Sequence, residues 1–214
     1  MTTLADILRG IEHGVFPDPD LTTSVVPAPS PRDTCVIGLT GHLVVAADVP
    51  VEWVASHLDL TDLAAPLNPP FLHALELFTG REVNGIDAML LAPALVDEAE
   101  RAELLAGLTP FGDESHPRIR RARRYRDEVR AFTTSDGGLV LTGLGLAGRR
   151  EVALEVDAAA RGRGVGRGLA RAARALVPVG AHVWAQVTPG NAASLRMFLA
   201  AGYVPVGSEA LLVR

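Results

Sequence analysis

The chain reads Asp157-Ala-Ala-Ala-Arg161-Gly162-Arg163-Gly164-Val165-Gly166-Arg167-Gly168-Leu169-Ala170 where a predicted strand passes through a turn into a predicted helix. The strand covers residues 151–156, because Val and Leu alternate there with Glu and Ala. The helix covers residues 164–177, because apolar residues recur at helical spacing and the helix-ending Pro178 and Gly180 follow. A glycine-rich helix start with arginine charge suits a phosphate group, although a tight turn with a solvated basic helix start is the alternative.

A second pattern follows the next predicted strand, residues 181–187, and reads Asn191-Ala-Ala-Ser194-Leu-Arg-Met-Phe198-Leu-Ala-Ala-Gly202-Tyr203. The first pattern, Arg161-x-x-Gly164-x-Gly166, resembles the acyl-CoA pyrophosphate loop (Q/R-x-x-G-x-G/A) of the GNAT superfamily of N-acetyltransferases. The second resembles the run N-x-x-A/S-x-x-x-Y-x-x-x-G-F/Y of the same family, with Phe198 where a tyrosine is common. The resemblance covers residues 129–214.

The resemblance implies an α/β fold of the GNAT type, with a mixed, mostly antiparallel sheet flanked by helices. Strands 151–156 and 181–187 are then a parallel pair, joined by a right-handed crossover and splayed beyond their ends. The pantetheine arm of the co-substrate acetyl-CoA enters between them, and its pyrophosphate accepts hydrogen bonds from backbone N–H groups of residues 162–168. The residues that the resemblance assigns to acetyl-CoA are Val156, Asp157, Arg161, Gly162, Arg163, Gly164, Val165, Gly166, Arg167, Gly168, Asn191, Ser194 and Phe198.

The implied activity is direct transfer of an acetyl group from acetyl-CoA to a primary amine, with a small molecule as the expected acceptor. A protein or peptide acceptor is one alternative. A catalytically inactive acyl-CoA-binding sensor is another, because Phe198 has no proton to give a departing thiolate. The amine must lose a proton, and Glu151 and Glu155 share the non-core face of the predicted strand, so either is a candidate base. Ion pairing with arginines is their alternative role, and Tyr203 is a further catalytic candidate.

The composition describes a globular chain of 214 residues, of which 48% are hydrophobic. No apolar run approaches the roughly 18 residues of a membrane span, and residues 1–11 read as a short amphipathic helix. A cytoplasmic location and no membrane partner are therefore expected. The lone Cys35 is expected to be a small buried hydrophobe, and no metal site is predicted. The absence of lysine excludes Schiff-base chemistry and a P-loop lysine. The oligomeric state stays open, a homodimer included.

The charge is unevenly distributed along the chain. Residues 1–117 hold four arginines against eighteen acidic residues, and residues 118–214 hold sixteen arginines against seven. This asymmetry suits a half that binds a polyanionic cofactor, and without a nucleic-acid motif no nucleic-acid partner is expected. The densest run, residues 118–126, is predicted to be a helix whose arginines form a solvated face or hold an anion such as the 3′-phosphate of the cofactor.

Residues 85–214 are predicted to form the acetyl-CoA-binding domain, and residues 1–84 an N-terminal extension or subdomain. Within the latter, the proline-rich segment 16–33 is expected to be extended. Strands at 35–39 and 42–46 and helices at 50–58, capped by Asp48, and 70–78 follow. A strand at 85–92 and a helix at 96–107 supply the first elements of the family fold, or residues 34–110 form an added subdomain. The sequence leaves both readings open.

A second glycine-rich segment precedes the strand at 151–156. A predicted hairpin joins residues 129–134 to 139–144 through an Asp-Gly turn, and Gly143-Leu-Gly145-Leu-Ala-Gly148 follows. These glycines match the dinucleotide fingerprint G-x-G-x-x-G, which requires a helix directly afterwards, whereas residues 149–156 alternate as a strand. Dinucleotide binding is therefore not predicted, and the glycines are expected to mark a bend and a turn.

Overall fold

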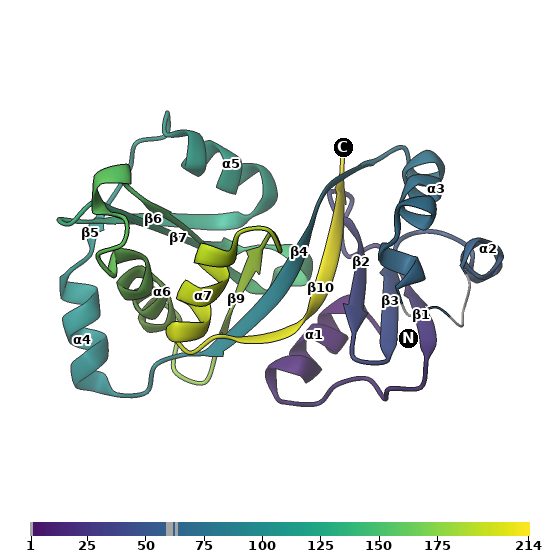
Figure 1. Ribbon diagram of the computed structural model, residues 1–214, viewed down its shortest axis with the longest axis horizontal. Helices are drawn as coiled ribbons and strands as arrows, with labels where there is room; N and C mark the ends of the chain where they lie inside the picture. Colours follow the sequence, from purple (N-terminus) through teal and green to yellow (C-terminus); the bar gives the residue numbers. More distant parts are fainter. Residues whose placement is uncertain (1, 59–61, 63) are drawn as a thin grey trace. The chain divides into compact units, whose positions relative to one another are not determined.

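The computed structural model describes residues 2–58, 62 and 64–214 (Figure 1). The α-helices are α1 (Leu4–Glu12), α2 (Val51–His57), α3 (Pro69–Thr79), α4 (Glu98–Ala106), α5 (Pro117–Tyr125), α6 (Val165–Leu176) and α7 (Ala192–Ala200). The β-strands are β1 (Thr22–Val26), β2 (Thr34–Leu39), β3 (His42–Ala46), β4 (Glu82–Pro93), β5 (Thr109–Pro110), β6 (Asp127–Thr134), β7 (Gly138–Leu144), β8 (Arg150–Val156), β9 (His182–Val187) and β10 (Val204–Val213).

The chain divides into two compact units. Unit 1 comprises residues 1–89, 186–190 and 205–214, and unit 2 comprises residues 90–185 and 191–204. The boundary between residues 84 and 85 that the sequence suggests stays a prediction.

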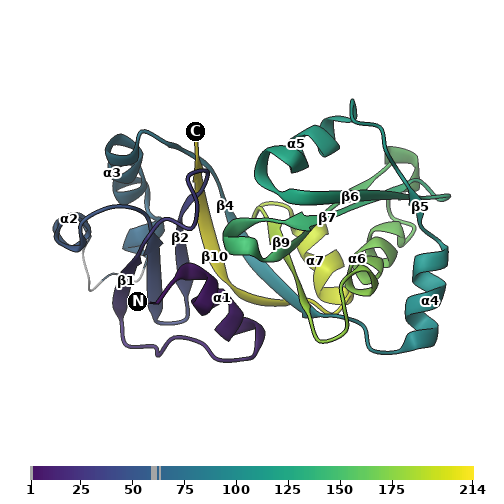
Figure 2. The same ribbon diagram turned by 180° about the vertical axis from the view of Figure 1, so that it is seen from behind.

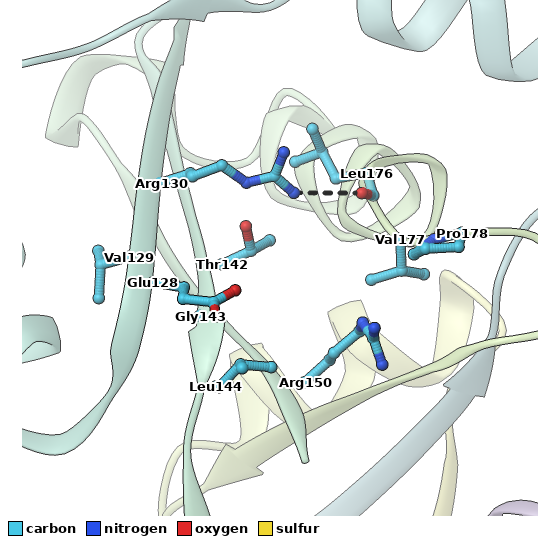
Figure 3. A pocket seen from close by; sticks show the side chains of 10 residues that line it. All are labelled: Glu128, Val129, Arg130, Thr142, Gly143, Leu144, Arg150, Leu176, Val177 and Pro178. Atoms are coloured by element: carbon cyan, nitrogen blue, oxygen red, sulfur yellow. Dashed lines mark hydrogen bonds between the residues drawn. The ribbon is translucent and has the colours of Figure 1, made fainter. Parts of the chain in front are cut away.

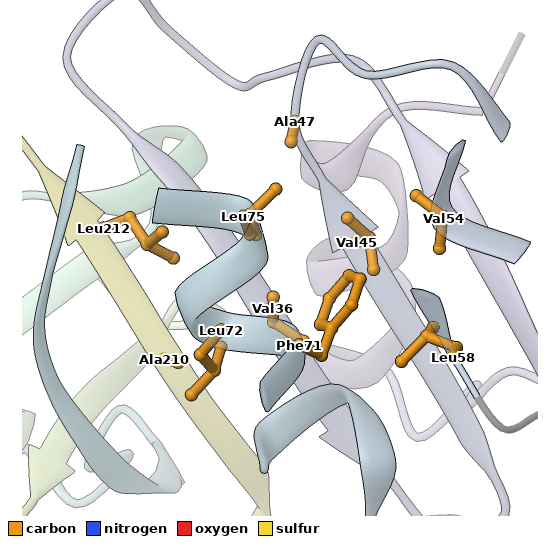
Figure 4. Packing of buried hydrophobic residues seen from close by; sticks show 10 residues of the cluster. All are labelled: Val36, Val45, Ala47, Val54, Leu58, Phe71, Leu72, Leu75, Ala210 and Leu212. Carbon is orange, nitrogen blue, oxygen red and sulfur yellow. The ribbon is translucent and has the colours of Figure 1, made fainter. Parts of the chain in front are cut away.

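Unit 1 is built on strands in the order β1-β3-β2-β10-β4. β1 and β3 are parallel, whereas β2 is antiparallel to both β3 and β10. α3 lies on one face of these strands, where Phe71, Leu72 and Leu75 belong to an apolar cluster with side chains of β2, β3 and β10 (Figure 4). Cys35 of β2 is fully buried, which confirms its predicted role as a small core residue.

The proline-rich segment 16–33, predicted to be extended, contains strand β1. The pairing runs from Thr22 opposite His42 to Val26 opposite Ala46. Further along, the guanidinium of the buried Arg81 donates to the backbone carbonyls of residues 31 (2.7 Å) and 32 (2.6 Å). The pairing of β1 with β3 and the hydrogen bonds of Arg81 therefore fix this segment. The amino-acid composition of the segment predicts neither interaction.

The predicted cap of α2 is wrong. The N-cap residue is Pro50, which makes no side-chain hydrogen bond to the helix. The carboxylate of Asp48 accepts instead from the backbone N–H of Ala28 (3.0 Å). The carboxylate that the sequence predicts as the cap of α2 thus binds the backbone inside the proline-rich segment.

Unit 2 is built on strands in the order β9-β8-β7-β6-β5. β5 pairs antiparallel with β6, β6 with β7, and β7 with β8, and β6 and β7 form the predicted hairpin, with Gly137 at φ 86° in its turn. α5 lies on one face of β6 and β7, and α6 lies on the opposite face with α4 beside it (Figures 1 and 2). Ile119 and Ala122 of α5 pack with Leu139 and Leu141 of β7.

β8 and β9 are parallel neighbours connected through α6. The predicted α/β class, with a mixed, mostly antiparallel sheet and a parallel pair, is thereby confirmed. The predicted strand at 85–92 is β4 and the predicted helix at 96–107 is α4. In the part of the chain that the structure describes, no helix is long and apolar enough to cross a membrane. Over those same residues, no group of three or more His, Cys, Asp or Glu is placed to hold a metal ion.

Candidate functional site

The loop after β8 leads into the first turn of α6. Gly164 is the N-cap residue, and its φ of 88° lies in the left-handed region that favours glycine. The N–H of Gly168 donates to the Gly164 carbonyl (3.1 Å) and closes the first turn. The N–H groups of Val165, Gly166 and Arg167 precede this bond at the positive end of the helix dipole. The start of α6 is therefore suited to an anion.

The four glycines of this loop differ in what surrounds them. A Cβ atom added at Gly162, Gly164 or Gly168 would meet no atom within 4 Å. A Cβ atom at Gly166 would lie 3.3 Å from Met197 of α7, so that this glycine permits close packing of α6 on α7. Three of the four glycines predicted to bind the cofactor thus border a space that a ligand can enter.

The charged residues of the loop lie on its surface. Asp157, Arg161, Arg163 and Arg167 are all exposed. Arg161 Nε donates to the carbonyl of Val156, the last residue of β8 (3.4 Å). Exposed guanidinium groups keep their rotational freedom, so these arginines can turn toward a phosphate at the helix start.

β8 and β9 separate toward this loop. Among the described residues, the pairing between the two strands is Glu151 opposite Trp184. β8 continues to Val156, where its ladder partner is Gly138 of β7. One edge of β8 thus stays paired while the other loses its neighbour, as the splayed pair requires. The unpaired edge ends at the glycine-rich loop.

Asn191 and Ser194 form the start of α7. Asn191 Oδ1 accepts from the Ser194 N–H (3.1 Å) and caps the helix. Asn191 is exposed and Ser194 is half-buried. The cap fixes the side chain of Asn191 and leaves its NH₂ group as the donor for a ligand.

Phe198 and Tyr203 are buried and form an edge-to-face ring pair with centroids 4.8 Å apart. The Tyr203 hydroxyl donates to the Ala170 carbonyl of α6 (3.2 Å). Burial raises the pKa of Tyr203 well above its ordinary value. A phenol that is buried, bonded to the backbone and harder to ionise is not placed to exchange protons with a substrate. The ring pair instead packs α7 and the segment after it onto the core of unit 2.

Glu151 is a buried carboxylate, only 5% exposed. Arg126 Nε (2.7 Å) and Arg149 Nε (2.8 Å) donate to its two oxygens, and the N–H of Leu146 donates as well (3.3 Å). Burial acts to raise the pKa of Glu151, but Arg149 and Arg126 outweigh burial and hold the pKa below its ordinary value. A carboxylate kept ionised by two arginines is a weak proton acceptor, and ion pairing is therefore the role that the geometry gives Glu151.

Glu155 lies on the same face of β8 and is more accessible, with 40% of its side chain exposed. Arg118 Nε donates to its Oε2 (2.6 Å). Two arginines of the basic run at 118–126, Arg118 and Arg126, therefore form ion pairs with the two carboxylates of β8. The face of β8 that the sequence predicts to lie away from the core is covered by α5.

In the glycine-rich turn at residues 143–148, the protein's own atoms fill the space beside two of the three glycines. A Cβ atom at Gly145 would overlap the carboxylate of Glu151, and one at Gly143 would lie 2.9 Å from the backbone oxygen of Asp127. Strand β8 follows, as the sequence predicts. Close approach within the fold therefore accounts for Gly143 and Gly145, and a left-handed backbone (φ 78°) accounts for Gly148, without a dinucleotide.

A pocket of about 520 Å³ lies at the C-terminal end of α6 (Figure 3). Arg130 of β6 donates to the Leu176 carbonyl (3.4 Å), and the side chain of Arg150 enters from β8. The hydroxyl of the buried Thr142 lines the pocket and has no hydrogen-bond partner among the described residues. α6 has 12 residues and is therefore about 18 Å long. The pocket and the glycine-rich loop are separate places, and no predicted site residue lines the pocket.

No protein-family model and no curated protein matches the sequence. Among solved structures, the chain is similar to a GNAT-family protein from Novosphingobium aromaticivorans, described as an acetyltransferase, with 16% identity over 63% of this chain and 68% of that chain and a TM-score of 0.39. It is also similar to a GCN5-related N-acetyltransferase from Kribbella flavida, with 18% identity over 67% of this chain and 63% of that chain and a TM-score of 0.42. The chain thus spans just under two thirds of the second protein. Both structures belong to the family that the sequence motifs resemble. Because both TM-scores are below 0.5, any assignment of function depends on this chain's own residues.

Proposed function

We propose that the chain is an acetyl-CoA-dependent N-acetyltransferase that moves an acetyl group directly to a primary amine on a small molecule. The observation that carries the proposal is a helix start bordered by open glycines, at the end of the unpaired edge of β8. A helix N-terminus favours a phosphate, and an unpaired strand edge favours an extended amide-bearing arm. Acetyl-CoA carries both chemical groups in one molecule.

Each predicted cofactor residue has a role in this proposal. The pyrophosphate would accept from backbone N–H groups of residues 162–168, with Arg161, Arg163 and Arg167 supplying positive charge. The pantetheine arm would pair with the edge of β8 near Val156 and Asp157. From α7, the NH₂ group of Asn191 would donate to an arm carbonyl, and Ser194 and Phe198 would line the arm.

Glu155 is the general base in this proposal. Glu151 is buried and held by two arginines, whereas Glu155 has one arginine partner and an accessible carboxylate. Tyr203 receives no catalytic role, because its hydroxyl is bonded to Ala170. Glu155→Gln should lower kcat by about 10²-fold or more. Its acetyl-CoA affinity should stay that of the parent, and an unchanged kcat would remove Glu155 from the mechanism.

A second candidate is an acyl-CoA-binding module without turnover. It is favoured by Phe198, which has no proton to give, and by Tyr203, whose hydroxyl is engaged in the core. A thiolate leaving group with a pKa of about 8.5 departs near neutral pH without a dedicated acid, which favours slow transfer over none.

Binding is tested by melting curves and titration calorimetry with acetyl-CoA. At a concentration about 100-fold above Kd, the ligand should stabilise the protein by about 2.7 kcal/mol. Gly164→Ala should weaken binding. Gly148→Ala is the matched control, because Gly148 (φ 78°) and Gly164 (φ 88°) are both left-handed with no atom within 4 Å of an added Cβ. Equal affinity in the two variants, or stabilisation by NADH in place of acetyl-CoA, would refute the proposal.

Turnover is tested by release of the CoA thiol with a panel of amines, polyamines, aminoglycosides and peptides. Release by the parent protein supports a transferase. If the ring of Phe198 points at the sulfur of the bound cofactor, Phe198→Tyr should raise the rate without changing acetyl-CoA affinity. Tight acetyl-CoA binding with no release by either protein supports the binding module. Release with peptides alone would replace the small-molecule acceptor by a protein acceptor.

A further inference from the structure

Asp20, Ser24 and His42 come together at the start of the parallel β1–β3 pair in unit 1. Ser24 Oγ lies 3.0 Å from His42 Nε2, and His42 Nδ1 lies 2.9 Å from Asp20 Oδ1. The register places His42 opposite Thr22, and side chains two residues apart on a strand share a face. Ser24 therefore lies beside the imidazole, while Asp20, just before β1, reaches the other ring nitrogen.

The chemistry of the three groups fixes the direction of the hydrogen bonds. Hydrogen bonds from His42 and Thr22 lower the pKa of Asp20 to about 2, so that it is an anion at neutral pH and can only accept. The proton of a neutral His42 then resides on Nδ1, and Nε2 offers its lone pair to the Ser24 hydroxyl. The His42 side chain is 7% exposed, Asp20 is 47% exposed and Ser24 is half-buried.

The backbone around Asp20 is held in an unusual conformation. Leu21 has φ 61°, left-handed for a residue with a bulky side chain, and its N–H donates to the Gly41 carbonyl (2.8 Å). Gly41 is itself left-handed (φ 66°), and a Cβ atom there would lie 2.7 Å from Pro19. A left-handed non-glycine residue persists only where its surroundings fix it, and such residues cluster at functional sites.

We propose that Ser24, His42 and Asp20 are a nucleophilic triad that cleaves small activated esters, an activity separate from acetyl transfer. Ser24 Oγ bonds to the ester carbonyl carbon while its proton passes to His42 Nε2. The ester C–O bond then breaks, and the leaving alcohol takes that proton. Water attacks the acyl-Ser24, with His42 as base, which releases the carboxylic acid and restores the serine. Asp20 keeps the imidazole in the required tautomer and stabilises its cation.

The position of Ser24 in the sheet suits this chemistry. β1 is the outermost strand in the order of unit 1, so that the N–H groups on its outer edge are not taken up by a neighbouring strand. The N–H of Thr22 is already donated to Asp20 Oδ1 (2.9 Å), so the donors available to a developing oxyanion are the outer-edge N–H groups from Ser24 onward. Because Ser24 is half-buried on this strand, the triad suits a small acyl group.

The test is covalent labelling of the whole protein with a fluorophosphonate probe, read by peptide mass spectrometry, together with hydrolysis of p-nitrophenyl acetate. Ser24 should carry the label, and Ser24→Ala should lose both signals. Asp20→Asn, nearly isosteric, should slow labelling by about 10²-fold or more, because it favours the wrong imidazole tautomer. Melting curves should show that both variants are folded.

Ser56 supplies a matched control within the same chain. Its Oγ lies 3.0 Å from His57 Nδ1, but that ring nitrogen also lies 2.8 Å from a backbone carbonyl, and no carboxylate of the described residues joins this hydrogen-bond chain. Ser56 should stay unlabelled, and Ser56→Ala and Gly164→Ala should label at the parent rate. Absence of label on Ser24 in the folded parent, or equal labelling in Asp20→Asn, would overturn the proposal. Neither result would affect acetyl-CoA binding, which is tested separately at Gly164.

Discussion

Two glycine-rich turns lie on either side of β8 and look alike in sequence, but they differ in what occupies the space around them. In the turn at 143–148, the carboxylate of Glu151 takes the place of a side chain at Gly145. In the turn at 162–168, Gly162, Gly164 and Gly168 have no neighbour within 4 Å of an added Cβ. The sequence shows that a glycine lacks a side chain. Only the structure shows whether other atoms of the protein fill the space that a side chain would occupy or whether that space is open to a ligand.

Substitutions in the turn at 143–148 should destabilise the fold more than those in the turn at 162–168, and Gly145→Ala should lower the unfolding free energy the most. The new methyl group displaces Glu151 and leaves Arg126 and Arg149 without their buried partner, which should cost about 3–5 kcal/mol of unfolding free energy. Urea unfolding measures this. A free energy within about 1 kcal/mol of the parent value, the usual range for a surface substitution, would show that the turn can open without loss.

Glu151→Gln tests the same carboxylate without overfilling the turn, and should cost about 3 kcal/mol at neutral pH. Because the pKa of Glu151 is lower in the folded chain than its ordinary 4.5, the stabilisation is present above pH 4.5 and declines as the pH falls through the lower folded value. The parent and the variant should therefore converge in acid. Unfolding curves between pH 7 and pH 3 measure the difference, and a constant gap would contradict the assigned ion pairs.

Gly162→Ala and Gly148→Ala compare the two turns at matched backbone angles, φ 76° and φ 78°. Neither added methyl group meets an atom within 4 Å, so both variants should lose about 1–2 kcal/mol from the left-handed backbone alone. The difference should appear in calorimetry with acetyl-CoA, where only Gly162→Ala is expected to bind more weakly. Unequal stabilities would reveal a packing contact in one of the turns.

Gly168→Ala should have the smallest effect on folding and the opposite sign. Gly168 lies inside α6 with open space around it, and alanine in an exposed helix interior gains about 0.5–1 kcal/mol over glycine. If the second turn receives the cofactor, this more stable variant should bind acetyl-CoA less tightly. A gain in both stability and affinity would place the ligand elsewhere.

The sequence allowed most of unit 2 to be predicted, because its signals are local. The Asp-Gly hairpin, the helix between residues 165 and 176 and the alternation of β8 each depend on neighbours within a few positions. The partners of Glu151 could not be predicted, because Arg126 reaches it from 25 residues away. The pattern correctly placed Glu151 and Glu155 on one face, but it does not show that a helix covers that face.

Unit 1 was less predictable because its restraints are long-range. β1 lies in a proline-rich segment that the sequence predicts only to be extended. Arg81, which donates to the carbonyls of residues 31 and 32, is about 50 residues away from them in the chain. The Ser24–His42–Asp20 chain matches no spacing motif, because its members meet through the parallel pairing of β1 and β3. A serine, a histidine and an aspartate at such intervals are common in any sequence.

The contacts of α5 also relate the length of a helix to the length of a strand. Arg118 lies in α5 and Arg126 directly follows this helix, eight residues or about 12 Å further along it. Glu151 and Glu155 are four residues apart, or about 13 Å along a strand. Both ion pairs can form together because the two lengths agree. One residue inserted into β8 would reverse the faces of the residues beyond it, and one inserted into α5 would turn its end by about 100°. The two ion pairs therefore couple the length of α5 to the length of β8. An insertion in only one of these segments would separate at least one arginine from its carboxylate.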